Sequence, residues 1–393
     1  MIEEIQGGGI TSVPGIKASG VHCGIKKEGL DLALIYSSTP SHFACMYTTN
    51  RIKGAHILVN KRRKGKIQAV VINSGNANCC TGRRGIDDAE RMAVLTAERL
   101  NISPSAVLVA STGIIGVPLP MDKIERGIDE AVKKLSEEGG IRASQAILTT
   151  DTRPKQFAIR YSMNGERLVI GGIAKGAGMI HPRLGTMLAF IATNAAISSQ
   201  SLRIYLKKSV DNSFNLITVD GDTSPNDLVV LLANGNLKMG QDIPYHKKFQ
   251  EALDYVTHHL AKMIVEDGEG ATKLIVIHVK GARSMSDAKR VAFSIGKSNL
   301  VKSAIYGCSP NWGRIITASG GAGVNIKQDK IDIYLGGEMV CKDGCMVNFD
   351  LVKVREILQK KEVLLTVDLK LGSSEARVLT PDLSPEYVKI NAP

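Results

Sequence analysis

Aromatic residues and long apolar runs are both scarce in this 393-residue sequence. Aromatic side chains make up 4% of the chain, with a single tryptophan, whereas 44% of the residues are hydrophobic. The core must therefore be built mainly from aliphatic side chains, alanine and glycine. No apolar run approaches the roughly 18 to 20 residues that cross a bilayer. Because the first residues, MIEEIQGGG, also lack the basic and apolar regions of a signal peptide, we expect a cytoplasmic protein.

Motifs for metal binding and for histidine-based catalysis are missing as well. The seven cysteines include no CxxC pair, and Cys341 and Cys345 have no second pair at metal-binding spacing. We therefore expect no disulfide framework and no structural zinc, and we interpret the cysteines as buried, inert thiols. The sequence contains no HExxH and no GxSxG, so it predicts neither a metal ligand set nor a histidine base.

The formal net charge of +12 raises the question of nucleic-acid binding. The lysines and arginines are scattered, and the densest run, NKRRKGK (60–66), has no interleaved aromatic side chains on which bases would stack. We interpret this run as a solvated turn between two strands. The sequence therefore predicts no nucleic-acid partner, although a diffuse positive field suits small anionic substrates.

Short β-like runs alternate with amphipathic helical patterns along the whole chain. We expect strands over 67–73, 105–111, 273–279 and 363–372, and helices over about 86–100, 121–140, 249–264 and 284–294. A chain of this length builds two lobes or one large layered body. Sheets covered by helices, with glycine-rich loops at the strand ends, predict an α/β layered sandwich whose loops carry the chemistry.

Two glycine-rich stretches resemble nucleotide-binding loops without meeting their spacing. In DGEGATK (267–273), Thr272 precedes Lys273, whereas a P-loop requires Gly-Lys followed by Ser or Thr. The stretch GGIAKGAGM (171–179) does not contain the order G-x-G-x-x-G. Neither stretch predicts a nucleotide site.

The junction Gly185-Thr186 in AKGAGMIHPRLGTMLAFI (174–191) admits two interpretations. A threonine hydroxyl is a weak nucleophile without a base. If the chain is cut before Thr186, the freed α-amine, with an ordinary pKa of about 7.7 to 8, supplies that base. A small residue before the threonine leaves the preceding carbonyl accessible to attack by the same hydroxyl. Alternatively, Thr186 simply caps a helix over 187–197.

The same stretch resembles the signature of the ornithine acetyltransferase family, whose usual form is KG-[small]-GMI-x-P-x-x-ATMLAF. Further blocks match that family in order over nearly the whole chain: NSGNANCCTG (73–82), STGIIGVPLP (111–120), TTDTRPK (149–155), SFNLITVDGDTSPND (213–227), DGEGATK (267–273) and PNWGRI (310–315). Several long motifs in one order make the resemblance highly specific.

The resemblance implies a self-processing enzyme of the N-terminal-nucleophile type, with the ornithine acetyltransferase or DmpA-like fold. Cleavage between Gly185 and Thr186 would give an α chain (1–185) and a β chain (186–393), associated as an α2β2 heterotetramer. The β chain would begin with the nucleophile, which takes acetyl from N-acetyl-L-ornithine and passes it to L-glutamate in arginine biosynthesis. No cofactor is implied, and the use of acetyl-CoA as a further acetyl donor stays open.

The family's site residues carry over to matching positions of this sequence. Thr112 and Gly113 correspond to the oxyanion-hole pair, which acts together with the nucleophile. The implied substrate contacts are Thr152, Lys175, Thr186, Glu269 and Asn391. We expect Lys175 to pair with the substrate α-carboxylate and Glu269 with the side-chain ammonium of ornithine.

The sequence departs from the family pattern at three places. Gly185 replaces the usual alanine, Ser309 stands where aspartate is usual, and the chain ends at NAP (391–393) rather than with the family's longer polar ending. Two other functions remain open at this point. One is a self-cleaving amidohydrolase or aminopeptidase that gives the acyl group to water, and the other is a non-catalytic chain that is never cut.

Overall fold

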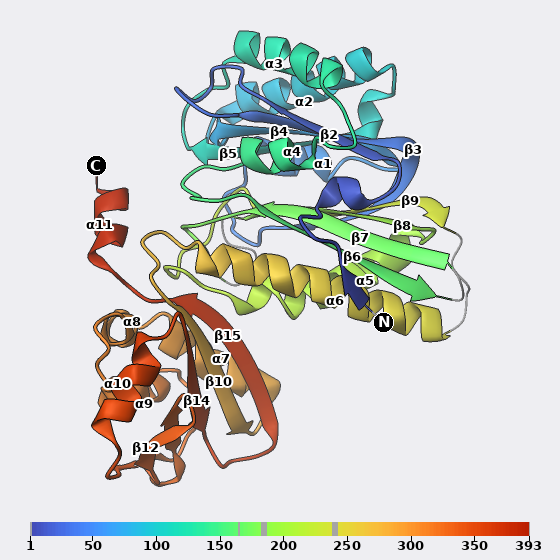
Figure 1. Ribbon diagram of the computed structural model, residues 1–393. Helices are drawn as coiled ribbons and strands as arrows, with labels where there is room; N and C mark the ends of the chain where they lie inside the picture. Colours follow the sequence, from blue (N-terminus) through green and yellow to red (C-terminus); the bar gives the residue numbers. More distant parts are fainter. Residues whose placement is uncertain (1, 164–165, 182–186, 238–242, 393) are drawn as a thin grey trace. The chain divides into compact units, whose positions relative to one another are not determined.

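The computed structural model describes residues 2–163, 166–181, 187–237 and 243–392 and divides the chain into two units (Figure 1). Unit 1 consists of Met1–Gly176, Arg183–Asn215 and Thr223–Ile264, and unit 2 of Ala177–Pro182, Leu216–Asp222 and Val265–Pro393. Both units therefore combine segments from before and after position 185.

Unit 1 contains nine strands and most of six helices within the described residues. The strands are β1 (Ile2–Glu4), β2 (Ile16–Val21), β3 (Leu32–Tyr47), β4 (Ile67–Asn76), β5 (Val107–Ile114), β6 (Lys155–Met163), β7 (Glu166–Lys175), β8 (Leu188–Ala195) and β9 (Leu228–Leu237). The helices are α1 (Ala55–Asn60), α2 (Gly82–Leu100), α3 (Met121–Lys133), α4 (Gly140–Ala146), α5 (Ser199–Asp211) and α6 (Ile243–Glu266). Short 3₁₀ helices are η1 (Ile10–Ser12), η2 (Pro104–Ala106), η3 (Phe214–Leu216) and, in unit 2, η4 (Gln328–Lys330).

The long strand β3 joins two sheets in unit 1. Its first part pairs with β2 and β4, and its last part, from His42 to Tyr47, pairs with β9. The strand order is β1-β6-β7-β8-β9-β3-β4-β5, and the β3–β4 register shifts between Tyr36 and Ser41, where β3 changes sheets. Helices α2 and α3 cover the outer face of one sheet and α6 the outer face of the other (Figure 1).

The interior of unit 1 is almost entirely aliphatic, as the composition predicts. The core between the two sheets contains, among others, Ile35, Val70, Ile72, Phe190 and Val230. All eight residues of β8 are buried. A strand with both faces covered reads as a continuous apolar run, which explains the abrupt change in the sequence after residue 186.

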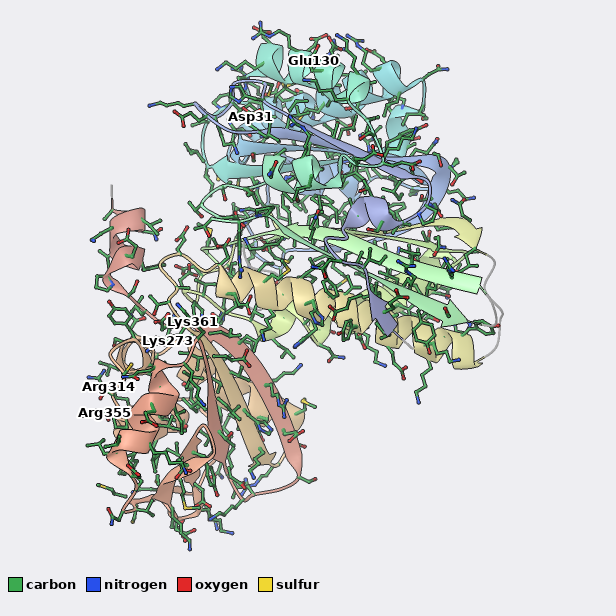
Figure 2. The ribbon with its side chains drawn as sticks, in the orientation of Figure 1. Asp31, Glu130, Lys273, Arg314, Arg355 and Lys361 are labelled. Carbon is green, nitrogen blue, oxygen red and sulfur yellow. The ribbon has the colours of Figure 1, made fainter. Side chains whose placement is uncertain are left out.

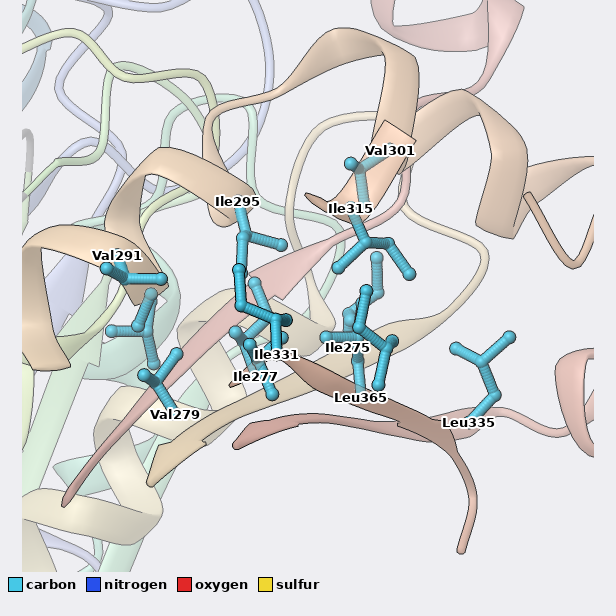
Figure 3. Packing of buried hydrophobic residues seen from close by; sticks show 14 of the residues in the cluster. Ile275, Ile277, Val279, Val291, Ile295, Val301, Ile315, Ile331, Leu335 and Leu365 are labelled. Atoms are coloured by element: carbon cyan, nitrogen blue, oxygen red, sulfur yellow. The ribbon is translucent and has the colours of Figure 1, made fainter. Parts of the chain in front are cut away.

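Unit 2 is one mixed sheet covered by helices. Its strands are β10 (Leu274–Ala282), β11 (Asp332–Leu335), β12 (Glu338–Lys342), β13 (Cys345–Met346), β14 (Glu362–Asp368) and β15 (Ser374–Pro381). Its helices are α7 (Met285–Gly296), α8 (Asn299–Tyr306), α9 (Trp312–Gly320), α10 (Leu351–Gln359) and α11 (Pro385–Asn391). The order is β13-β12-β11-β14-β10-β15; β10 and β14 run parallel, and the other four neighbouring pairs of these described strands are antiparallel. Figure 3 shows Ile277 and Val279 of β10 packed beneath Val291 and Ile295 of α7.

The structure confirms the predicted α/β layered sandwich and most of the predicted elements, but it corrects four expectations. Residues 188–195 form strand β8, so the interpretation of Thr186 as the cap of a helix over 187–197 is wrong. The helix predicted over 121–140 ends at Lys133 because Ser136 instead forms a β-bridge with Ala18. The run 60–66 follows α1 rather than a strand. The seven cysteines are free thiols, but Cys80 and Cys345 are exposed, so the expectation that all are buried is wrong.

Several of the cationic side chains bind backbone carbonyls. In unit 2, the Lys273 Nζ atom donates to the carbonyl of Ile305 (2.8 Å) and the Arg314 Nη1 atom to that of Leu300 (2.8 Å). Figure 2 labels both cations. Among the described residues, no helix is long and apolar enough to cross a membrane.

Candidate active site

Thr112 and Gly113 lie at the end of β5, where it runs parallel to β4. The side chain of Thr112 is buried, with the residue 3% exposed, and the backbone of Gly113 pairs with Gly75. Gly113 has a φ of 132°, and a Cβ atom there would lie 2.3 Å from the carbonyl carbon of Gly75. Only glycine fits this close approach of two backbones. The predicted oxyanion pair is thus fixed by strand pairing rather than by a free loop.

Lys175, at the end of β7, points its ammonium group at two threonines. Its Nζ atom donates to Thr149 Oγ1 (2.7 Å) and, at the long limit of a hydrogen bond, to Thr112 Oγ1 (3.4 Å). Because the Thr112 oxygen accepts from Lys175, the hydroxyl proton of Thr112 is free to point elsewhere. A hydroxyl polarised in this way is well suited to donate to a developing oxyanion.

Asp151 compensates two buried lysines. Its Oδ1 atom lies 2.7 Å from Lys155 Nζ, and its Oδ2 atom lies 3.8 Å from Lys175 Nζ; the side chains of all three residues are at most 2% exposed. Asp151 also accepts the backbone N–H groups of Gly176 (2.6 Å) and Thr149 (3.1 Å). This carboxylate therefore orients Lys175 and the two chain segments that contain Gly176 and Thr149.

Asp151, Lys155 and Lys175 together form what we call the Asp151 cluster. Its electrostatics favour the charged form of the Asp151 carboxyl group. Burial alone would raise the pKa of Asp151, but the charges of Lys175 and Lys155 and the N–H of Gly176 outweigh it and hold the pKa well below its usual range. The three side chains of this cluster, two ammonium groups and one carboxylate, together carry one net positive charge, and all three are buried. Such a site stabilises an anion, either a substrate carboxylate or a reaction oxyanion.

Register places the start of β8 beside this cluster. Leu188 pairs with Lys175 on one side and with Leu228 of β9 on the other. The backbone N–H of Met187 donates to Asp227 Oδ1 (3.0 Å). The predicted nucleophile Thr186 and the residue before it, Gly185, lie outside the described residues.

Glu269 and Asn391 meet in unit 2. The Asn391 Nδ2 atom donates to Glu269 Oε2 (2.8 Å), and the Glu269 N–H donates to the carbonyl of Ala177 (2.9 Å). A Cβ atom on Gly178 would lie 2.4 Å from the Glu269 carboxyl, so the glycine leaves room for that group. Glu269 is half-buried and Asn391 is exposed.

Tyr387 of α11 and Asp220 extend this region of unit 2. Burial, together with the nearby carboxylates of Asp220 and Glu269, raises the pKa of Tyr387 to about 12. Asp220 itself accepts the N–H of Ile180 (3.0 Å) and also that of Met179. Two carboxylates near one polar face are chemically suited to a ligand ammonium group.

The predicted site residues thus fall into separate described groups. Thr112, Gly113 and Lys175 belong to unit 1, as does Thr152, which is exposed in the loop before β6. Glu269 and Asn391 belong to unit 2. Within the described residues, no group of three or more His, Cys, Asp or Glu side chains is arranged to hold a metal ion.

Reasoning from the sequence missed several polar residues, most of them with buried side chains, around the predicted ones. They are Thr149, Asp151 and Lys155 beside Lys175, and Asn226 and Asp227 before β9. All five lie inside blocks that carry the family resemblance, TTDTRPK and SFNLITVDGDTSPND. A charged or amide residue within such a block, directly before or after a buried strand, was the available signal.

Comparison with known proteins identifies relatives across the whole chain. The model of the ArgJ family matches residues 17–393. A protein of Symbiobacterium thermophilum named arginine biosynthesis bifunctional protein ArgJ is 47% identical over 392 residues, which cover 98% of this chain and 98% of the relative. Its namesake in Caldanaerobacter subterraneus subsp. tengcongensis is 46% identical over 397 residues, covering 99% of this chain and 98% of the relative.

A solved structure of the Mycobacterium tuberculosis ornithine acetyltransferase, complexed with ornithine, is 37% identical with a TM-score of 0.44, covering 46% of this chain and 98% of that chain.

Proposed function

The chain belongs to the ArgJ family and is an acyltransferase of arginine biosynthesis, and from this premise we propose that it moves an acetyl group from N-acetyl-L-ornithine to L-glutamate. The nucleophile is the hydroxyl of Thr186, freed when the chain cuts itself between Gly185 and Thr186. The products of that cut are an α chain, 1–185, and a β chain, 186–393.

The observation that carries this proposal is the strand pairing at Lys175. Lys175 contacts Thr112 through Nζ and pairs through its backbone with Leu188, two residues after Thr186. Two consecutive Cα steps of about 3.8 Å span at most ~7.6 Å. Chain connectivity therefore supports a nucleophile close to the oxyanion donor and to the net positive charge of the Asp151 cluster.

Self-cleavage uses the same hydroxyl as acetyl transfer, before the α-amine has been freed. The Thr186 hydroxyl attacks the carbonyl carbon of Gly185, and the C–N bond between the two residues breaks. The acyl group moves to oxygen, and the hydroxyl proton passes to the leaving nitrogen of Thr186. Water then hydrolyses the ester, which releases the Gly185 carboxylate and the α-amine of Thr186. That amine, with an ordinary pKa of about 7.7 to 8, is the base for the later steps.

Acetyl transfer follows in two balanced steps. The α-amine takes the Thr186 hydroxyl proton while the oxygen attacks the acetyl carbonyl of N-acetylornithine, and the resulting oxyanion accepts hydrogen bonds from the Thr112 hydroxyl and the Gly113 N–H. The amide C–N bond breaks, the proton goes to the ornithine amine, and an acetyl ester of Thr186 remains. The amine of glutamate then attacks this ester, which yields N-acetylglutamate and regenerates the hydroxyl.

The two charged ends of the substrate are assigned to different protein groups of opposite charge. We assign the α-carboxylate to the positive region around Lys175, together with Thr152, and the ornithine side-chain ammonium to Glu269 and Asn391. The proposed reaction requires no cofactor; acetyl-CoA would enter only as an alternative acetyl donor. We further propose an α2β2 assembly in the cytoplasm.

Intact mass under denaturing conditions tests the proposal first. We expect two fragments whose masses sum to the uncut chain plus one water, with threonine leading the second, and acetyl transfer from N-acetylornithine to glutamate. Thr186→Ala should leave a soluble, uncut chain without activity, and Thr186→Ser should retain slow cleavage because it keeps a hydroxyl.

Two results would refute the assignment. Acetyl transfer by Thr186→Ala at the wild-type rate would exclude Thr186 as the nucleophile. Steady release of acetate from cleaved protein that ignores added glutamate would identify the amidohydrolase instead.

A further inference from the structure

Asn226 and Asp227, the two residues directly before β9, each bind the chain neighbour of a predicted catalytic residue. Asn226 Nδ2 donates to the carbonyl of Ser111 (2.8 Å), which precedes Thr112. Asp227 Oδ1 accepts the N–H of Met187 (3.0 Å), which follows Thr186. One dipeptide therefore connects the end of the oxyanion strand, β5, to the start of the strand that follows the nucleophile, β8.

The Met187 N–H belongs to the peptide unit that joins residues 186 and 187. A peptide unit is planar, and its six atoms include the Cα atoms of both residues. An acceptor that fixes the Met187 N–H therefore also fixes the plane on which the Cα of residue 186 lies. The hydroxyl-bearing side chain and the α-amine both leave from that Cα, so their directions depend on this hydrogen bond.

The surroundings of Asp227 suit a rigid, uncharged acceptor. The residue is 0% exposed, and its Oδ2 atom has no hydrogen-bond partner within the part of the chain that the structure describes. Burial raises the pKa of Asp227 well above its usual range; the Met187 N–H, the Thr48 hydroxyl and the charge of Lys175 offset this only in part. A neutral carboxylic acid still offers a carbonyl oxygen to an N–H donor.

We propose that Asp227 is a positioning residue for the nucleophile: its Oδ1 atom fixes the peptide plane between residues 186 and 187 and so aligns the attacking hydroxyl with Thr112, which Asn226 holds through Ser111. This inference rests on the proposed function, because it takes Thr186 as the nucleophile. It assigns Asp227 no contact with substrate and no proton transfer.

Two substitutions of Asp227 by side chains of nearly equal shape test whether its acceptor oxygen or its carboxyl charge is needed. Asp227→Asn keeps an Oδ1 acceptor and mimics the neutral acid, so we expect self-cleavage and a kcat within about threefold of wild type. Asp227→Val removes the acceptor. Since a displacement near 1 Å at a reacting group costs about 100-fold in rate, we expect kcat per cleaved site to fall by roughly 30- to 100-fold, with KM within about twofold and self-cleavage slowed in parallel.

Asp332→Val is a stability control in unit 2, which also breaks the ion pair of Asp332 with Lys370 (2.7 Å). Asp332 is 4% exposed and accepts the N–H of Asp343 (2.9 Å), so its loss also strips a backbone amide of its partner. This variant should unfold at a lower temperature and keep the wild-type kcat. If Asp227→Val gives no soluble protein, Asp227→Ser, whose side chain is too short to replace the acceptor, takes its place with the same expected loss.

The outcomes separate clearly. A wild-type kcat and cleavage rate in Asp227→Val would overturn the proposal. An Asp227→Asn variant as slow as Asp227→Val would also overturn it, because the charge or proton of the carboxyl, and not its acceptor oxygen, would then be needed. Thr186→Ala, assayed in parallel, keeps the proposed function apart: activity in that variant refutes the nucleophile itself, whereas its inactivity beside a normal Asp227→Val refutes only the positioning role.

Discussion

The two groups of predicted site residues differ in how firmly their surroundings hold them. In unit 1, Lys175, Lys155 and Asp151 have side chains at most 2% exposed and form a compensated charge cluster with hydrogen bonds to the backbone. In unit 2, Glu269 is half-buried and is bound by the exposed side chain of Asn391. The first group resembles a preorganised catalytic environment, and the second a surface that adapts to a ligand.

This difference follows from where each group lies on its sheet. The unit 1 cluster lies at the end of β7, the start of β6 and the loop before β6. Because these strands are paired, a displaced side chain there would disturb the sheet itself. Asn391 ends the seven-residue helix α11, and Glu269 lies in the loop after α6. We therefore expect substitutions in the first group to change stability and kcat, and substitutions in the second to change KM.

The largest effect is expected from Asp151→Ala. This change leaves the two buried ammonium groups of Lys155 and Lys175 without their carboxylate, and removing one partner of a buried ion pair costs about 3 to 5 kcal/mol. Soluble yield and the unfolding temperature should both fall sharply. Asp87→Ala, which breaks the exposed pair with Arg83 (3.0 Å), should cost less than about 1 kcal/mol.

A second substitution at this position, Asp151→Asn, should show a pH dependence that follows from the low pKa of Asp151. The folded-state pKa lies below its ordinary value of 3.8, so the carboxylate contributes its full stabilisation above that value and loses it as the pH falls toward the folded-state pKa. The difference in unfolding temperature between wild type and Asp151→Asn should therefore be constant near neutral pH and shrink below about pH 4. An equal difference at all pH values would show that packing, and not charge, is lost.

A smaller effect, confined to catalysis, is expected from Thr112→Val. Removing one oxyanion-hole donor typically lowers kcat by about 10²- to 10³-fold, and KM should stay unchanged because the hydroxyl acts in the transition state. Thr96→Val is the matched control, since Thr96 is buried in α2 and donates to the carbonyl of Met92 (2.8 Å). A similar loss of kcat in both variants would show that the fold of unit 1, and not the oxyanion donor, is affected.

Much of the fold was predictable because its signals are local. Strand β4 and helix α7, with Ser284 at its N-cap, follow directly from apolar periodicity and capping preferences. Strand β8 was open to a helical interpretation, because a run such as MLAFIATNAAI has no strand period when both faces are buried. Only its pairing with β7 and β9 decides the matter, and pairing is a long-range property.

The site was predictable from motifs, but its supporting residues were not. The resemblance named Thr112 and Lys175, and no spacing in the sequence indicates that they are neighbours 63 residues apart. Asp151 and Asp227 read as ordinary loop carboxylates. Their burial is a property of the folded chain alone. The opposite directions of their pKa shifts depend on whether nearby lysine charge outweighs burial, as at Asp151, or burial outweighs it, as at Asp227.

The smallest effects are expected in unit 2, from the pair of Glu269 and Asn391. Glu269→Gln removes the negative charge proposed to bind the ornithine ammonium but keeps the size of the side chain, so KM for N-acetylornithine should rise about tenfold while kcat and the unfolding temperature stay near wild type. Asn391→Ala loses one exposed hydrogen bond to Glu269 (2.8 Å) and should raise the same KM by about two- to threefold. Glutamate has no side-chain ammonium group, so its KM should respond less in both variants. A large loss of kcat with unchanged KM in Glu269→Gln would contradict the contrast drawn between the two groups, because it would place Glu269 in the chemical step itself.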